Sequence, residues 1–174
     1  CGEETVYTEA ESDKLQSAEL AAQQIIFDVF DMYSSGDPVA EKRLADYSAA
    51  ELGEIVSAES MMRMEGFAFL SAVSSFKSGK KVIGDIVRLG EVTSKFDGDQ
   101  IIVDLEVIGS EKNAEAEIIF NKNWLVSGNY LTFQLESASL NPVMTKGEMM
   151  GKAGLNTLIG MGTVFLVLIF ISFI

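Results

Sequence analysis

The chain has 174 residues, a formal net charge of −13, no His and a single Cys. It therefore cannot by itself supply the usual zinc ligands, a Ser–His or Cys–His nucleophile pair, or a His ligand for haem. The acidic excess also argues against nucleic acid as a partner, because binding a polyanion requires Lys and Arg. These exclusions argue against an autonomous enzyme, although a hydrolase that holds its metal through carboxylates alone stays open.

The N-terminal stretch begins with Cys1 and continues as GEETVYTEAESD (2–13), which has five acids and no base. This composition is typical of a flexible tether. The combination resembles a processed bacterial lipoprotein, in which the first Cys carries a thioether-linked diacylglycerol. We therefore expect Cys1 to be lipidated and residues 1–13 to form the tether. An arbitrary chain boundary is the alternative, although an unmodified lone thiol would be a liability in an oxidising compartment.

The first regular element is expected over residues 14–35, where apolar residues recur every three or four positions. This spacing predicts an amphipathic helix with one face turned to a core. Two caps are open for its start: Thr8 with Glu11, or Ser12 and Asp13.

Two further helix starts follow in the sequence. Asp37 as N-cap and Pro38 in the first helical position predict a short helix that ends near Tyr47. Ser48 and Glu51 have the spacing of a capping box, which predicts that the next helix begins there.

The last helix of this series is expected over residues 58–77, with Gly79 ending it. Its Met and aromatic side chains have the composition of a cofactor pocket, but at helical spacing we expect them to form core. The residues concerned are Met61, Met62, Met64, Phe67, Phe69, Leu70 and Val73.

From about residue 83 to 136 the pattern changes to that of β-strands. QIIVDLEVI (100–108) and AEAEIIF (114–120) alternate apolar and polar residues, which predicts strands with one buried face. A last strand is expected over 124–135, with a bulge at Gly128. The connections are short, so the strands should pair as an antiparallel β-meander of about four strands.

The expected fold class is therefore α+β, with the N-terminal helices packed on one face of the sheet and an extracytoplasmic domain over residues 14–140. This order of elements resembles the cone-shaped, nuclear-transport-factor-like domains, which often hold a pocket between helices and a curved sheet. The pairs Asp104/Glu106 and Glu115/Glu117 look like catalytic acids. On alternating strands we expect them to form the solvated face instead.

After a linker over residues 141–152, the chain ends in a long apolar stretch. The last twenty residues, from Leu155 to Ile174, contain no charged side chain. A helix of that length spans ~30 Å, the thickness of a bilayer's hydrocarbon core. We therefore expect a single transmembrane helix over 153–174, with a buried core helix as the alternative.

The sequence of this stretch, GLNTLIGMGTVFLVLIFISFI (154–174), resembles the single span of the gamma chain of oxaloacetate decarboxylase and its relatives. The resemblance rests on a Gly-Leu entry, the run Leu158 to Gly162, and an aliphatic run with Phe from Val164 onward. These proteins are the small subunits of bacterial sodium-pumping, biotin-dependent decarboxylases. About 150 residues precede the span here, whereas relatives usually begin near it, and the cytoplasmic tail that docks the carboxyltransferase is absent from this sequence.

The resemblance implies a role and a set of partners. A gamma chain has no decarboxylase chemistry of its own. It holds the carboxyltransferase subunit, through the tail, to the multi-span subunit that decarboxylates carboxybiotin and moves sodium ions. Biotin and sodium ions are therefore expected in partner subunits and no cofactor in this chain.

The span also has features of an interface. Gly160 and Gly162 lie ~200° apart around a helix, and Gly160 aligns with Asn156 and Thr163. Small residues let backbones approach, and polar ones can bond across helices, so we expect this face to dock on the multi-span subunit. Glycines tolerated in a simple anchor are the alternative. The full expected interface is Gly154, Leu155, Asn156, Leu158, Gly160, Met161, Gly162, Thr163 and Phe165.

Together these observations predict a non-catalytic accessory subunit in the bacterial cytoplasmic membrane, with its N-terminal domain outside and its C-terminus in the cytoplasm. Lys146 and Lys152 would then lie on the outer side, which counts mildly against that orientation. The alternative is a doubly anchored extracytoplasmic ligand-binding or sensor lipoprotein. The substrate stays open among oxaloacetate, malonate, methylmalonyl-CoA and glutaconyl-CoA.

Overall fold

The computed structural model describes residues 6–121, 125–127, 130–132, 134–143 and 171–172. The chain divides into two compact units, Cys1–Pro142 and Val143–Ile174. Apart from Ile171 and Ser172, the expected transmembrane helix lies outside the described residues, and so do residues 144–152 of the expected linker. None of the helices that are described is long and apolar enough to cross a membrane.

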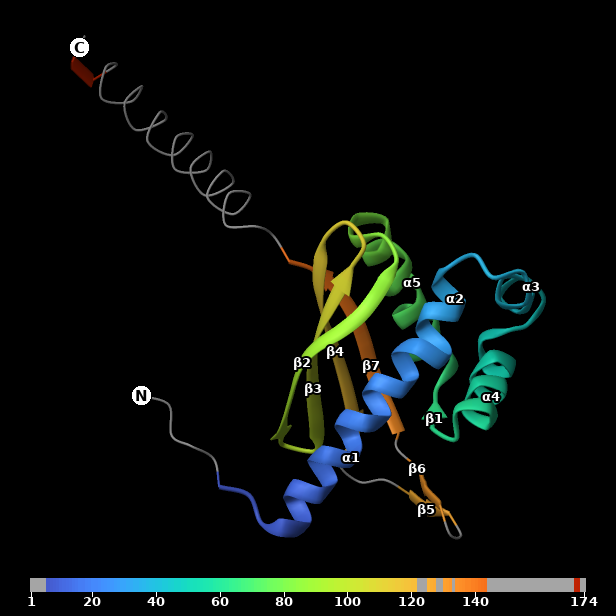
Figure 1. Ribbon diagram of the computed structural model, residues 1–174. Coiled ribbons are helices and arrows are strands. Elements are labelled where there is room, and N and C mark those ends of the chain that lie inside the picture. The colour runs from blue at the N-terminus through green and yellow to red at the C-terminus, as the bar shows by residue number, and fades with distance from the viewer. Residues whose placement is uncertain (1–5, 122–124, 128–129, 133, 144–170, 173–174) are drawn as a thin grey trace. The chain divides into compact units, whose positions relative to one another are not determined.

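The chain enters the fold through one long helical segment, drawn in blue in Figure 1. It consists of α1 (Glu9–Ile25), the π-helical turn η1 (Ile26–Asp31) and α2 (Met32–Ser34). The capping box of Thr8 and Glu11 confirms the first of the two predicted caps: each side chain accepts from the other residue's backbone N–H, at 3.1 and 3.2 Å. The helix therefore starts at Glu9 rather than Lys14, so part of the expected tether is helical.

The next two helices begin where their caps predicted. Helix α3 (Pro38–Asp46) starts after Asp37, whose carboxylate accepts from the Ala40 N–H at 3.0 Å. Helix α4 (Ala49–Ser60) starts after Ser48, which forms a capping box with Glu51. Short-range hydrogen bonds decide both starts, which is why the sequence alone located them.

The predicted helix over 58–77 is wrong as one continuous element, because residues 58–60 end helix α4 and residues 66–77 belong to the following helix. Helix α4 ends at Ser60 because Met61 adopts a left-handed conformation, with φ 54°. A short strand β1 (Arg63–Met64) and a new helix α5 (Gly66–Ile83) follow. The hydroxyl of Ser57 bonds both to the backbone N–H of Met64, at 2.8 Å, and to its carbonyl, at 3.1 Å, which folds the chain back on α4.

The predicted stop at Gly79 is also wrong, because that glycine serves packing rather than termination. A Cβ at Gly79 would lie 2.8 Å from the side chain of Leu140, so only Gly lets α5 approach strand β7 this closely. The helix instead ends at Ile83, four residues after Gly79. The next residue, Gly84, caps the end with a positive φ of 78°.

The sheet has five strands in the order β1-β7-β4-β3-β2. Strands β2 (Ile86–Asp97), β3 (Gln100–Gly109), β4 (Asn113–Asn121) and β7 (Gln134–Pro142) pair antiparallel, in agreement with the predicted meander. Strand β1 is the fifth strand and pairs with β7 in the parallel direction, so the sheet is mixed.

The predicted single strand over 124–135 is wrong. Strands β5 (Leu125–Ser127) and β6 (Tyr130–Thr132) pair with each other as a separate two-stranded sheet, and β7 begins only at Gln134. The bulge expected at Gly128 lies outside the described residues.

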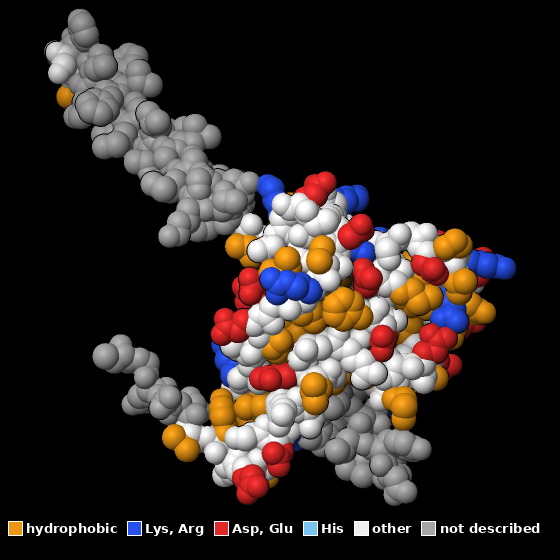
Figure 2. All heavy atoms as spheres, in the orientation of Figure 1, with side chains coloured by type: hydrophobic (Ala, Val, Ile, Leu, Met, Phe, Trp, Pro, Cys, Tyr) orange, Lys and Arg blue, Asp and Glu red, His pale blue; other side chains and the backbone are white. Residues whose placement is uncertain are grey.

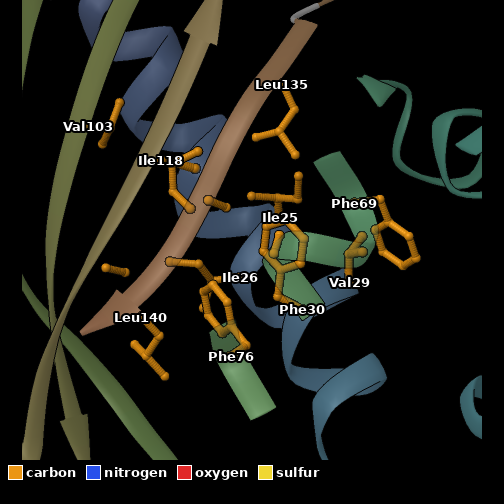
Figure 3. Packing of buried hydrophobic residues seen from close by; sticks show 14 of the residues in the cluster. Ile25, Ile26, Val29, Phe30, Phe69, Phe76, Val103, Ile118, Leu135 and Leu140 are labelled. Carbon is orange, nitrogen blue, oxygen red and sulfur yellow. The ribbon is translucent and has the colours of Figure 1, made fainter. Parts of the chain in front are cut away.

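The core lies between one face of the sheet and helices α1 and α5, which confirms the α+β class and the one-sided packing (Figure 3). Alternate residues of β3 and β4 are fully buried there, as their pattern predicted. Aromatic side chains fill the centre: the ring of Phe30 stacks on that of Phe76, with centroids 4.9 Å apart. The buried strand residues are Ile101, Val103, Leu105, Val107, Ala114, Ala116, Ile118 and Phe120.

Candidate functional site

The site residues predicted from the sequence all lie outside the described residues. They are the expected lipidation site Cys1 and the expected membrane interface of Gly154, Leu155, Asn156, Leu158, Gly160, Met161, Gly162, Thr163 and Phe165. Both therefore stay predictions. The candidate site that the structure does describe belongs to the N-terminal unit.

This site is a groove of about 430 Å³ between the first helical segment and the end of α4. Five buried side chains from both sides form its floor: Ile25, Val29, Tyr33, Val56 and Met62. Figure 2 shows hydrophobic side chains gathered on the face that carries α1 and α4, with acidic side chains among them. The floor offers an apolar surface to any molecule that enters from this face.

Two apolar side chains at the groove extend into solvent. Leu20 of α1 is 62% exposed, and Met61, just after α4, is 60% exposed. Single exposed apolar residues are common, but two that line the same groove extend its apolar surface outward. The prediction that Met61 belongs to the core is wrong. This residue is exposed because its left-handed backbone turns it away from the face that buries Met62. Phe67 was likewise assigned to the core and is 72% exposed.

Unusual backbone conformations occur on both sides of the groove. On one side, Asp28 and Val29 belong to the π-helical turn η1, and on the other Met61 is left-handed. π-turns and left-handed non-Gly residues both cost energy, and both are found frequently at functional sites. Among the described residues, Met61 is the one non-Gly residue with positive φ.

A polar network joins two residues of the groove's lining, Tyr33 and Glu59, to Arg43. Arg43 binds both carboxylate oxygens of Glu59, at 2.8 and 2.9 Å, and donates to the hydroxyl of Tyr33 at 3.0 Å. The Glu59 hydrogen bond, with a smaller contribution from Tyr33, holds the pKa of Arg43 above its usual range. Arg43 therefore stays charged and neutralises Glu59.

Asp28 is the other carboxylate that lines the groove. It is exposed, and no hydrogen bond or ion pair is found for it within the described part of the chain. With Glu59 neutralised by Arg43, Asp28 carries the uncompensated charge among the described lining residues. The electrostatic character of the groove is therefore negative.

The acidic residues on the strands form a different surface. Asp104 lies opposite Glu117 in the register, and Glu106 lies opposite Glu115. Glu106 and Glu115 are exposed and the other two are half-buried, which confirms the predicted solvated face. Their side chains point to the face of the sheet away from the core.

Comparison with known proteins identifies no relative. No family model, curated protein or solved structure matches the chain.

The groove was not predicted from the sequence, although its lining was visible there. A continuous helix over 58–77 leaves no opening beside Met61 and Met62. The resemblance to cone-shaped domains indicates a pocket between helices and sheet instead, whereas the lining of this groove comes from residues 17–33 and 56–62. An available signal was Leu20, a large apolar side chain on the polar face of an amphipathic helix.

Proposed function

We propose that this chain is a non-catalytic membrane accessory subunit that assembles and stabilises a sodium-translocating, biotin-dependent decarboxylase complex. The observation that carries the proposal is the sequence of residues 154–174, with its Leu158-to-Gly162 run followed by Val164 and Phe165. Coupling decarboxylation to ion transport requires the soluble and membrane parts to stay together. A small subunit that binds both raises their effective concentration.

In this proposal the multi-span subunit contacts the face of Asn156, Gly160 and Thr163 within the membrane. The carboxyltransferase binds a cytoplasmic tail that is not in this sequence, and biotin and sodium ions belong to the partners. Lipidation at Cys1 and the span hold the N-terminal unit outside the cytoplasmic membrane.

The assembly role is tested at Gly160. Replacing Gly160 with Leu adds bulk where a neighbouring helix is expected to approach closely, so recovery of the multi-span partner after mild detergent solubilisation should fall. Ile169→Phe adds bulk ~180° away around the helix and is the matched control. Unchanged recovery with Gly160→Leu, or an equal loss with both variants, would rule out this docking face.

A second function is favoured by the groove of the N-terminal unit. A pocket of about 430 Å³ with an apolar floor has the size and composition of a small-molecule site. This observation supports an extracytoplasmic ligand-binding or sensor lipoprotein, anchored at both ends.

A further inference from the structure

We infer that the groove between α1–η1 and the end of α4 binds a small amphipathic organic cation, with an ammonium or guanidinium head and an apolar body. The inference rests on the second of the two proposed functions and names its ligand class. It is independent of the decarboxylase assembly role.

The apolar body of the ligand is recognised by the floor of the groove. Ile25, Val29 and Met62 are buried in the core yet line the groove, so they present a fixed apolar surface. Leu20 and Met61 stand above this floor and can cover the sides of a bound molecule. Met side chains adapt to different shapes, which suits them to this position. The volume of about 430 Å³ fits one aromatic ring or a short branched chain.

The charge of the ligand is decided by the two carboxylates of the lining. The carboxylate of Glu59 is bound by both terminal guanidinium nitrogens of Arg43, so it adds little to the binding of a cationic ligand. Asp28 has no such partner among the described residues and lines the same groove as the apolar floor. A cationic head placed beside Asp28 is attracted, whereas an anionic head is repelled.

The position of Asp28 separates the two parts of the ligand. Asp28 is exposed, while its neighbour in sequence, Val29, is buried in the floor. A ligand that lies across this edge keeps its charged head hydrated and its apolar body out of water. Such a placement avoids the cost of burying an unpaired charge.

The experiment uses a matched pair of probes and the full-length chain in phosphatidylcholine nanodiscs, with empty nanodiscs subtracted. 2-Phenylethylamine and 3-phenylpropanoate share an aromatic ring and a short linker but carry opposite charges. Isothermal titration calorimetry should show binding of the amine, and binding of the carboxylate about two- to fivefold weaker, as expected for one exposed ion pair.

Variants assign any binding to the groove. Asp28→Asn should weaken amine binding about two- to fivefold, whereas Asp13→Asn, at an exposed acid elsewhere on α1, should leave it unchanged. Ala21→Phe places a ring inside the groove and should abolish binding of both probes. Circular dichroism melting curves establish that each variant is folded, and a second filler, Ala21→Leu, replaces Ala21→Phe if that variant does not fold.

The outcomes separate the inference from the function on which it rests. Equal binding of the two probes, abolished by Ala21→Phe and unaffected by Asp28→Asn, would overturn the cationic ligand class and leave a ligand-binding groove. Absence of binding by both probes up to their solubility limits would overturn the inference. Binding that persists unchanged in the filled variants would place the probes elsewhere and overturn it as well.

Discussion

The side chain of Lys80 is 8% exposed, and Asp31 balances its charge. Its Nζ donates to Oδ1 of Asp31 at 2.7 Å, which ties α5 to the π-helical turn. An ammonium removed from water in this way is costly unless it is paired. The ion pair of Lys77 with Glu41, at 3.1 Å, is far more exposed, with side chains 38% and 45% accessible. Water screens that pair, so it contributes little to stability.

Asp31→Ala is therefore expected to lower the free energy of unfolding by about 1–3 kcal/mol, because it leaves Lys80 without its anion. The matched change Glu41→Ala, which breaks the exposed pair with Lys77, should lower it by less than about 1 kcal/mol. Urea denaturation followed by circular dichroism measures both changes. Similar losses of unfolding free energy in the two variants would contradict the expectation that the buried pair of Lys80 with Asp31 matters more than the exposed pair of Lys77 with Glu41.

Met61 is a second residue at which the local chemistry predicts a measurable effect. Its φ of 54° suits Gly better than any residue with a Cβ. Met61→Gly should raise the free energy of unfolding by about 0.5–1 kcal/mol, because relief of strain exceeds the added entropy of the unfolded chain. The control Ala58→Gly, inside α4, should lower it by about 1 kcal/mol. Thermal unfolding compares the two; a loss of stability in both would contradict the strain argument.

At the scale of elements, the sequence predicted best where short-range signals act. The caps at Asp37 and Ser48 are local hydrogen bonds, so their patterns located two helix starts. The capping box at Thr8 was one of two open alternatives, and the first helix starts five residues before its expected position. The alternation in β3 and β4 predicted which residues face the core, because a strand with one buried face must alternate.

The sequence predicted least well where a contact with a distant residue decides the structure. The break at Met61 depends on the Ser57 hydroxyl holding the Met64 backbone, and helical periodicity continues across it. Gly79 is a helix stop by composition, yet contact with Leu140 makes it a packing position. Strand β1 was missed because two residues carry no periodicity, and only pairing with β7 makes them a strand.

The register of β3 and β4 leads to a prediction for the sheet. Glu106 and Glu115 lie directly opposite each other, and like charges in such a pair repel. Glu115→Lys converts the repulsion into attraction and should raise the free energy of unfolding by about 0.2–1 kcal/mol. Glu111→Lys makes the same change of charge on an exposed residue between the two strands and is the control.

The gain from Glu115→Lys should also shrink in high salt, since the groups are exposed and mobile ions screen them. Denaturation at low and high ionic strength measures this dependence. A gain equal to that of Glu111→Lys would trace the effect to net charge alone rather than to the cross-strand pair.

At the scale of the whole molecule, the chain combines two parts with different proposed roles. The described N-terminal unit has a packed α+β core and a groove that sequence patterns did not reveal, because its two walls come from segments separated by more than twenty residues. The apolar C-terminal stretch carries the sequence resemblance on which the assembly role depends. The two roles are compatible, since a subunit held at a membrane complex can also bind a ligand outside the membrane.

The proposed membership in a sodium-translocating decarboxylase complex is tested most directly by isolating the chain from its native membranes. Membranes are solubilised in mild detergent, the chain is isolated through an affinity tag placed between Gly2 and Glu3, and the material is probed for a biotinylated companion. Decarboxylation of oxaloacetate, malonate, methylmalonyl-CoA and glutaconyl-CoA is then measured with and without sodium ions. We predict a biotin signal and sodium-dependent decarboxylation of one of these substrates. A chain that is recovered without a biotinylated companion and without decarboxylase activity would contradict it.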